Sequence, residues 1–511
     1  MPDFVVLNVN EVPKSVNKSK NVSFIEVQPD SENVVSKIDI ECEAGKTEIQ
    51  KWNKNSVREK SIKKLFERYC EKTTVHGLRY FAQSDQHWSE RVLWIIMVLL
   101  AMVGVIYVSL LLSERFNSTP LATVLESTIY PVSDIPYPSV TICNYNRVNW
   151  NRVEAAKRKY IPNATENVVK QFESYLKTIN RLEYGSFDEF KEIDTWDIDA
   201  LEHIDLLELY RDVAYSCEEM FDSTAICWWR NKFFNCCQIF HTQRSEYGIC
   251  LSFNSVTNSD GHEMFLNSSN SYPRRTSSSM DWSGLRIEIT IPTSGMPPDL
   301  PAEDMGLMVI VGNPFEWPTD GYLVPAGTNT GVSVHPTYSY ATENIYHLAI
   351  NQRMCISDED IKLNHIDNAS VMRLPLRLDR YYVGNCYSEC RQQHMIKFCN
   401  CTVDFFYTPG NYTPCRMSGI KCLNKFDQIM NYQKPPSGNS FFSDDEPGIS
   451  CNCWQECTRT EYAVEVAPNM LSEATPGKII LDVHYQRSTT VKYRTDVVFG
   501  WMDLMGKCFS N

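Results

Sequence analysis

The longest uninterrupted apolar stretch of the chain runs from Val92 to Leu112 and contains no charged residue. As an α-helix, its 21 residues would cross the hydrocarbon core of a bilayer, which is about 30 Å thick. A secretory signal peptide would begin nearer residue 1 and have a shorter apolar core, and a buried helix of a soluble domain rarely runs so far without a polar residue. The pattern therefore predicts a transmembrane helix at residues 92–112.

The basic residues that flank this span indicate its orientation. Lys72, Arg79 and Arg91 lie within the twenty residues before it, whereas Arg115 is the only basic residue in the twenty after it. Because cytosolic flanks are enriched in Lys and Arg, we expect a cytosolic N-terminus and an extracellular C-terminal part. The preceding segment Ser56–Lys72 has one apolar helical face among basic residues. This pattern fits both a helix on membrane lipid and a solvated helix packed on its own tail.

Beyond the span the pattern alternates between strand-like and helix-like stretches. Two segments repeat apolar residues with helical spacing, Glu166–Leu182 and Ala200–Ala214. Four β-branched runs bounded by Gly, Pro or Asn predict strands: Pro138–Cys143, Leu285–Ile291, Leu307–Val311 and Lys478–Tyr485. No repeat of fixed period occurs. The mixture predicts an α+β fold with four segments: a cytosolic region (1–91), the span (92–112), an extracellular Cys-rich domain (113–495) and a short membrane-approaching end (496–511).

Composition narrows the classes of function. The chain has 511 residues, of which 43% are hydrophobic and 22% are charged, as in ordinary globular proteins. Its net charge of −14 lacks the basic excess of a nucleic-acid binder, so no nucleic-acid partner is expected. His262-Glu263 lacks the second histidine of a zinc-protease helix, and the chain has neither a Gly-x-Ser-x-Gly elbow nor a P-loop. We expect neither an enzyme nor a bound cofactor or metal.

The nineteen cysteines divide at the membrane. Cys42 and Cys70 precede the span, sixteen lie between Cys143 and Cys457, and Cys508 is near the end. An even set on the predicted outer side is typical of an oxidised extracellular domain, so the Cys-x-Cys pairs favour disulfides over zinc. If each pair lies in a strand, its two thiols share one face and can form a ladder of bridges, although the sequence alone does not fix the pairing. Sequons on the same side make six asparagines candidates for glycosylation: Asn117, Asn163, Asn267, Asn368, Asn400 and Asn411.

The cysteine spacing resembles one family closely. The matching segments are Cys386-Tyr-Ser-Glu-Cys390, Cys399-Asn-Cys401, Cys415, Cys422 and Cys451-Asn-Cys453-Trp-Gln-Glu-Cys457-Thr-Arg-Thr-Glu-Tyr462. Others are His76-Gly77, Tyr137-Pro-Ser-Val-Thr-Ile-Cys143-Asn144, Tyr247-Gly248-Ile-Cys250-Leu-Ser-Phe253-Asn254, and Gln352-Arg353-Met-Cys355 with Asp358-Glu359. In this order they resemble the degenerin/epithelial sodium channel family over residues 56–505. The segment Tyr493-Arg-Thr-Asp-Val-Val-Phe-Gly-Trp-Met-Asp-Leu is most similar to the insect pickpocket branch.

The resemblance implies a subunit of a trimeric, sodium-permeable and amiloride-sensitive channel of the plasma membrane, assembled as a homo- or heterotrimer. It implies a domain divided into palm, β-ball, knuckle, finger and thumb, and a gating role for His76 and Gly77. It also implies six disulfides: Cys143–Cys250, Cys355–Cys457, Cys386–Cys453, Cys390–Cys451, Cys399–Cys422 and Cys401–Cys415. Cys227 would pair with Cys236 or Cys237. Cys217 and the remaining one of these two cysteines could then form an eighth bridge. Nested bridges would then staple the thumb helix to the segment that returns toward the membrane, so that motion of the outer domain reaches the membrane spans.

The chain departs from the family pattern at its end. A second span and its Gly-x-Ser selectivity filter should follow Trp501-Met-Asp-Leu-Met505, but the sequence reads Gly506-Lys507-Cys508-Phe509-Ser510-Asn511. We therefore expect residues 496–511 to be the truncated start of a second span, and the pore helix and the filter to be absent from this chain. Two alternatives to a conducting subunit stay open, a non-conducting regulatory or dominant-negative subunit and a type II cell-surface binding protein. Asp358 and Glu359, which could sense protons, are expected to be solvated or ion-paired.

Overall fold

The computed structural model describes most of the chain beyond residue 86. The described residues are 65, 68–70, 72–73, 80, 87–118, 120–222, 224–268, 271–291, 295–298, 305–358, 360, 380–408, 410–434, 447–471 and 477–498. Several positions named above fall outside them: Cys42, His76, Gly77, Glu359, Asn368, Cys508 and the residues 499–511.

The predicted membrane span lies within a longer helix, α3 (Trp88–Ser118). Its residues 88–114 are long and apolar enough to cross a membrane, and no other helix of the described ranges meets that test. The apolar side chains are exposed, as for Leu93, Val103 and Leu110, which is expected where lipid is the surrounding medium. The first strand begins at Leu121, three residues after the helix ends. The span is therefore followed almost directly by the first strand of the folded domain.

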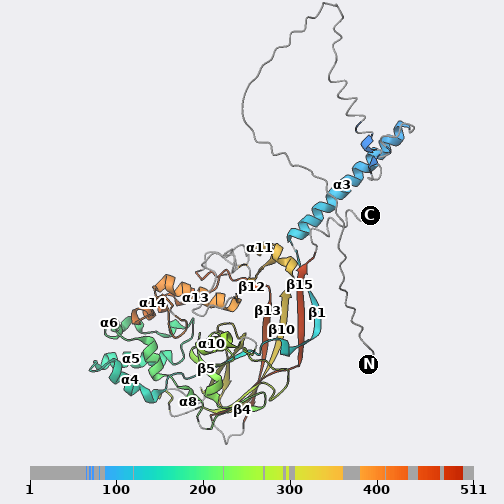
Figure 1. The fold of residues 1–511 in the computed structure, drawn as a ribbon. Helices are drawn as coiled ribbons and strands as arrows, with labels where there is room; N and C mark the ends of the chain where they lie inside the picture. The colour runs from blue at the N-terminus through green and yellow to red at the C-terminus, as the bar shows by residue number, and fades with distance from the viewer. Residues whose placement is uncertain are drawn as a thin grey trace, which may run out of the picture. The chain divides into compact units, whose positions relative to one another are not determined.

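The larger sheet is mixed and contains β1, the strand that directly follows the span (Figure 1). Its order is β1-β15-β10-β14-β7-β3-β4, with β13 paired to β10. The strands are β1 (Leu121–Pro131), β3 (Ile226–Trp229), β4 (Lys232–Phe234), β7 (Leu285–Thr290), β10 (Thr328–Ala341), β13 (Arg459–Met470), β14 (Lys478–Tyr485) and β15 (Thr489–Val497). β7 and β14 match predicted strands, and the α+β fold class is confirmed.

The long strand β10 contains a proline, which cannot donate a hydrogen bond to a neighbouring strand. One edge of β10 pairs with β14 from Thr328 to Val334 and then with β15 from Thr337 to Ala341. Pro336 lies in the break between these two partners, where neither strand is paired to that edge. A central strand tolerates the proline because it lies where β10 changes partners.

A smaller sheet lies against the first and is ordered β5-β6-β2-β8-β9. Its strands are β2 (Ser139–Asn144), β5 (Phe240–Ser245), β6 (Gly248–Phe253), β8 (Gly306–Gly312) and β9 (Tyr322–Pro325). Tyr137, just before β2, is fully buried in the shared core. Its hydroxyl donates to the Val483 carbonyl at 2.6 Å and accepts from the Leu285 amide at 3.1 Å. A buried ring with a satisfied hydroxyl thus links the two sheets.

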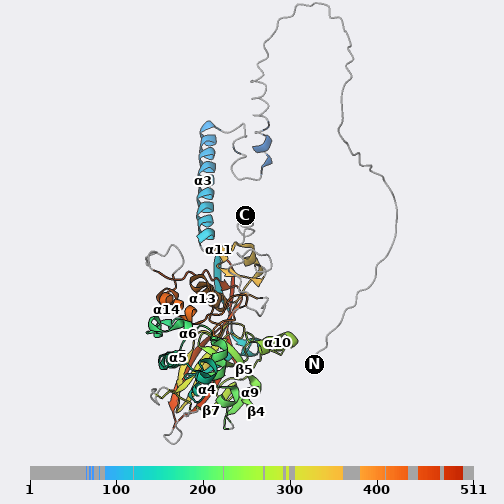
Figure 2. The same cartoon turned by 90° about the vertical axis from the view of Figure 1, so that its left-hand side faces the viewer.

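A second core is helical, and Figures 1 and 2 show α5, α6 and α14 side by side. The helices are α4 (Val153–Tyr160), α5 (Glu166–Ile179), α6 (Ile198–Leu201), α7 (Leu206–Val213), α8 (Cys217–Met220), α9 (Cys236–Ile239), α10 (Ser259–Asn267), α11 (Ile350–Arg353), α13 (Val383–Cys399) and α14 (Met417–Asn431). The predicted single helix Ala200–Ala214 was wrong, because the chain turns after Leu201. The Asp205 side chain then accepts from the Glu208 amide and starts a new helix, α7.

Candidate functional site: the disulfide-fastened helix α13

All sixteen cysteines between Cys143 and Cys457 form disulfides in the structure. The bridges are Cys143–Cys250, Cys217–Cys237, Cys227–Cys236, Cys355–Cys457, Cys386–Cys453, Cys390–Cys451, Cys399–Cys422 and Cys401–Cys415. The choice between Cys236 and Cys237 therefore falls on Cys236 as the partner of Cys227. Among the described cysteines Cys70 alone has a free thiol. Four of the eight bridges involve α13 or the residues directly after it.

Two of these bridges form a ladder between a helix and an extended segment. Cys386 and Cys390 are four residues apart on α13, an advance of about 6 Å along the helix axis. Their partners Cys453 and Cys451 are two residues apart in the segment before β12, which has no regular secondary structure. Two residues of extended chain advance about 6.6 Å, so a segment close to this conformation can meet both positions of the helix. Neither Cys-x-Cys pair lies in a strand, since Cys451 and Cys453 precede β12 (Gln455–Glu456) and the other pair lies at the end of α13.

The ladder leads into the larger sheet. After the short strand β12, the segment continues as β13, which pairs with β10 along residues 328–339. β10 pairs with β15, and β15 pairs with β1, the strand that follows the span. A continuous series of disulfides and backbone hydrogen bonds therefore connects α13 with β1.

Carboxylates from two other segments cap the N-terminus of α13, whose own N-cap residue Tyr382 makes no side-chain cap. The Val383 amide donates to Glu456 Oε1 at 2.5 Å, and the Gly384 amide donates to Glu316. The first amides of a helix have no partner within the helix, so carboxyl oxygens that accept from them satisfy donors that would otherwise be unpaired. Both carboxylates line a cavity of about 810 Å³.

The loop that carries Glu316 is held on the first turn of α13. The Asn385 side chain accepts from the Trp317 amide at 2.7 Å and donates to the Phe315 carbonyl at 2.8 Å. The Phe315 ring stacks on Tyr382 with centroids 5.3 Å apart and an interplanar angle of 5°. These contacts fix Glu316 close to Glu456. Burial and, secondly, the negative charge of Glu456 raise the pKa of Glu316 to about 8, and burial raises the pKa of Glu456 as well.

Known proteins with similar sequences identify the class of molecule. The family model described as the amiloride-sensitive sodium channel matches residues 69–510. This chain belongs to that family. Its members are ion channels and not enzymes, and they function as oligomers.

The family includes several insect relatives of this chain. Pickpocket protein 19 of Drosophila melanogaster is 23% identical over 439 residues, which cover 85% of this chain and 84% of the relative. Sodium channel protein Nach of Drosophila ananassae is 20% identical over 419 residues, covering 80% and 72%. Acid-sensing ion channel 4-B of Danio rerio is 20% identical over 408 residues, covering 78% and 60%. The resemblance to this family and its pickpocket branch is thereby confirmed.

The family motif Gln352-Arg353-Met-Cys355 contains a buried ion pair. Arg353 is 4% exposed and forms an ion pair with Asp360, which is 8% exposed. The Asp360 carboxylate also accepts from the amide and the hydroxyl of Ser357, both at 2.7 Å. Burial alone would raise the pKa of Asp360, but these hydrogen bonds and the charge of Arg353 outweigh it and lower the pKa. The pair lies beside the Cys355–Cys457 bridge, next to the start of β13.

The other predicted site residues are dispersed. Asp358 forms an exposed ion pair with Arg380 at 3.4 Å, as expected for a surface carboxylate of this channel subunit. Asn163, Asn267, Asn400 and Asn411 are exposed, and Asn117 lies in α3.

A cluster on the strands that follow the span was not predicted from the sequence. Glu126 on β1 accepts from Lys492 Nζ at 3.0 Å and from the Tyr340 hydroxyl. These hydrogen bonds, Tyr340 first, lower the pKa of Glu126. The ammonium of Lys492 also lies 4.6 Å from the ring centroid of Tyr340 and 5.3 Å from that of Tyr130. In the sequence, only the spacing of Tyr338 and Tyr340 indicated that aromatic side chains gather on one face here, since residues i and i+2 share a face of a strand.

The raised pKa of Glu316 predicts a pH-dependent stability. Between about pH 4.3, the ordinary pKa of Glu, and pH 8, the folded chain keeps the Glu316 proton that the unfolded chain has lost. Stability should therefore decrease as the pH rises through this window, by up to about 5 kcal/mol, and be unaffected by this group below it. Glu316→Gln should remove this slope in melting experiments on the full chain at pH 5 and pH 8.

The control for this experiment is Glu192→Gln, which changes an exposed carboxylate far along the chain from the cap. It should leave the slope of the wild-type chain intact. An unchanged slope in Glu316→Gln would show that Glu316 ionises normally in the folded chain.

Proposed function

We propose that this chain is a subunit of a sodium-permeable, amiloride-sensitive cation channel of the plasma membrane, assembled as a homo- or heterotrimer with related subunits. The observation that carries the proposal is the family match over residues 69–510. The relatives named pickpocket protein 19 and sodium channel protein Nach support it. In the proposed topology residues 1–91 are cytosolic, residues 92–112 span the membrane, the Cys-rich domain 113–495 is extracellular and residues 496–511 approach the membrane again.

The geometry supports a mechanical role for the Cys-rich domain. A movement of α13 relative to the sheet must displace Cys451 and Cys453, because both are covalently fixed to this helix. These residues lead into β13, which pairs with β10 along most of its length. Displacement would then pass through β10 and β15 to β1 and the span. Disulfides suit this role because a covalent link transmits a displacement directly, whereas packed side chains can shift relative to one another.

His76 and Gly77 are proposed as gating residues on the inner side of the membrane. The proposal rests on the family motif and on their position fifteen residues before residue 92. Glycine there supplies backbone freedom that a residue with a Cβ lacks. Gly77→Ala should change the open probability of channels that contain this chain, and unchanged gating would contradict the assignment.

Recording whole-cell current tests the proposed transport. The chain and pickpocket protein 19 of Drosophila melanogaster are each expressed alone and then together. Surface labelling verifies that the chain is delivered to the membrane. We expect the chain to alter a current whose reversal potential follows the external Na⁺ concentration and which amiloride blocks. If the current of the relative is the same with and without surface-delivered chain, the proposal fails in favour of a type II surface binding protein.

Glycosylation provides a test of the orientation. An extracellular domain predicts that removal of Asn163, Asn267, Asn400 or Asn411, each to Gln, increases the electrophoretic mobility where that sequon carries a glycan. Asn17→Gln and Asn21→Gln are matched controls, because these sequons precede the span and should stay unmodified. A chain whose mobility changes only in these two controls would have the opposite orientation.

A further inference from the structure

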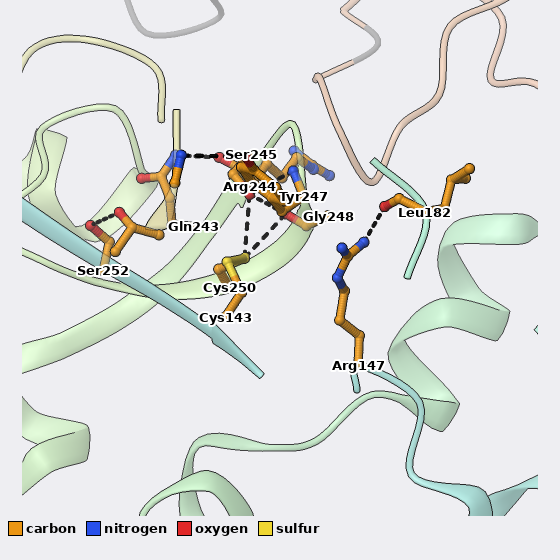
Figure 3. Close-up of a disulfide and its surroundings, with 12 residues drawn as sticks. Cys143, Arg147, Leu182, Gln243, Arg244, Ser245, Tyr247, Gly248, Cys250 and Ser252 are labelled. Atoms are coloured by element: carbon orange, nitrogen blue, oxygen red, sulfur yellow. Dashed lines mark hydrogen bonds between the residues drawn. A yellow bond between two sulfur atoms is a disulfide. The ribbon is translucent and has the colours of Figure 1, made fainter. Parts of the chain in front are cut away.

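A second cavity lies beside the Cys143–Cys250 bridge, where β2 and β6 meet α7 and α8. Its volume is about 790 Å³, within the range of cavities that bind small organic ligands. Figure 3 shows the bridge together with Arg244 and with Arg147, whose guanidinium points toward the Leu182 carbonyl. Trp317 lines both this cavity and the one lined by Glu316 and Glu456, and the proposed channel function assigns nothing to the cavity beside the bridge.

Three arginines line this cavity in a chain whose net charge is −14. Arg244 donates to the Thr408 hydroxyl at 3.1 Å and Arg147 to the Leu182 carbonyl, both of which are neutral groups. Within the described ranges, none of Arg147, Arg211 and Arg244 forms an ion pair with a carboxylate. Burial, together with the charge of Arg211, lowers the pKa of Arg244. The positive charges are therefore concentrated here without compensation by direct partners.

Two carboxylates lie near these arginines. Glu218 belongs to the lining but is exposed. Asp404 lies outside the lining; burial, followed by the charge of Asp205, raises its pKa to about 6, and the charges of Arg244 and Arg211 act against this rise. Within the described ranges neither carboxylate forms an ion pair with the three arginines. The lining itself therefore holds three arginines against one carboxylate, Glu218.

Three residues of this lining have a buried hydrogen-bond donor without a partner. Asn144 and Arg147 are each 6% exposed and Trp317 is 4% exposed, and all three line the cavity. Asn144 Nδ2, Arg147 Nε and Trp317 Nε1 have no hydrogen-bond partner among the residues that the structure describes. The amide of Asn144 is oriented by its oxygen, which accepts from the Asn146 amide at 3.0 Å. Because an unpaired buried donor is destabilising, three such donors in the residues of one lining favour a bound acceptor.

We propose that this cavity binds a small organic anion whose carboxylate accepts hydrogen bonds from Arg147, Arg244 and the Trp317 indole. Guanidinium groups suit carboxylates because their paired N–H donors match the two oxygens. Ile142, Met220 and Leu251 of the same lining provide apolar surface for the rest of the molecule. Such a ligand would contact β2, β6, α8 and the loop of Thr408 at once, and it would therefore link the smaller sheet with the helical part of the domain.

Three probes of equal shape and different charge test the proposal on the full chain in detergent micelles. Benzoate, benzamide and benzamidine are titrated while ligand-detected NMR measures saturable binding. Because each charge-assisted hydrogen bond contributes about 1.5–3 kcal/mol, we expect benzoate to bind at least about tenfold more tightly than benzamide. Benzamidine should not bind. Equal affinities for benzoate and benzamide, or no saturable binding of benzoate, would overturn the proposal and leave a water-filled cavity.

Variants locate the binding. Arg244→Gln and Arg211→Gln should each weaken benzoate binding, Arg244→Gln by about tenfold, because each removes one positive charge from the lining. Arg211 is exposed, so its replacement should leave the fold intact even if a change at Arg244 does not. Arg158→Gln is the matched control, since it removes an exposed charge on α4 outside the cavity. Benzoate binding that is unaffected by both lining variants would place the ligand elsewhere.

Discussion

Removing both rungs of the ladder, by Cys386→Ala, Cys390→Ala, Cys451→Ala and Cys453→Ala, is expected to cost more than the sum of the two single-rung losses. With one rung intact, the other closes a loop of only about six residues, and its loss should cost about 2 kcal/mol. Without either rung, the segment is restrained mainly by Cys355–Cys457 and becomes a much longer loop. The loss of both should therefore cost about 6 kcal/mol.

Melting of the full chain in detergent, combined with hydrogen exchange of the α13 amides, measures this effect. The control removes two bridges elsewhere, Cys217–Cys237 and Cys227–Cys236, whose separations are 20 and 9 residues. It should leave the protection of α13 unchanged. Additive effects of the two rungs would indicate that the extended segment is held on α13 by packing and not by the disulfides.

Replacing Arg353 by methionine is expected to destabilise the Cys-rich domain by about 3–5 kcal/mol, because it leaves the Asp360 carboxylate buried without its charged partner. The arginine also donates from Nε to the Cys355 carbonyl at 3.0 Å, so the backbone next to Cys355–Cys457 loses a contact. The loss should be smaller at acidic pH. The pKa of Asp360 is lowered in the wild type, so its contribution is present above the ordinary pKa of about 3.9 and disappears as the pH falls through the lowered value.

An exposed ion pair in the same region provides the comparison. Arg380 and Asp358 are 3.4 Å apart, with side chains 68% and 48% exposed. Arg380→Met should change the stability by no more than about 1 kcal/mol, because water screens and competes for exposed charges. Similar melting temperatures for Arg353→Met and Arg380→Met would show that the buried Arg353–Asp360 pair contributes no more to stability than the exposed pair.

The strands that could be predicted are those whose sequences carry an unbroken signal. The predicted runs correspond to four observed strands, because β-branched residues recur in each run and Gly, Pro or Asn bounds it. These runs are Pro138–Cys143 (β2), Leu285–Ile291 (β7), Leu307–Val311 (β8) and Lys478–Tyr485 (β14). β10 was missed since Gly331 and Pro336 interrupt its alternation. The break between its two partner strands, which accommodates Pro336, is a property of the sheet and leaves no mark in the local sequence.

The candidate site was predictable only where covalent chemistry defined it. Cysteine spacing and the family motifs implied six bridges, and the resemblance implied that they staple a helix to the segment that returns toward the membrane, as α13 shows. Glu316 and Glu456 are separated by a long stretch of chain and meet at the first turn of α13. No periodicity relates them. The cavity with its unpaired donors likewise depends on contacts among distant segments, so it could be found only in the structure.

The central claim is that this chain functions as one subunit of an oligomeric channel at the cell surface. Its most direct test expresses two differently tagged copies of the chain together with pickpocket protein 19, labels the surface proteins and captures one tag. We predict that the captured surface fraction contains a second subunit, either the other tagged copy or the relative, in complexes of three chains. Recovery of the surface chain as a monomer alone would contradict the account.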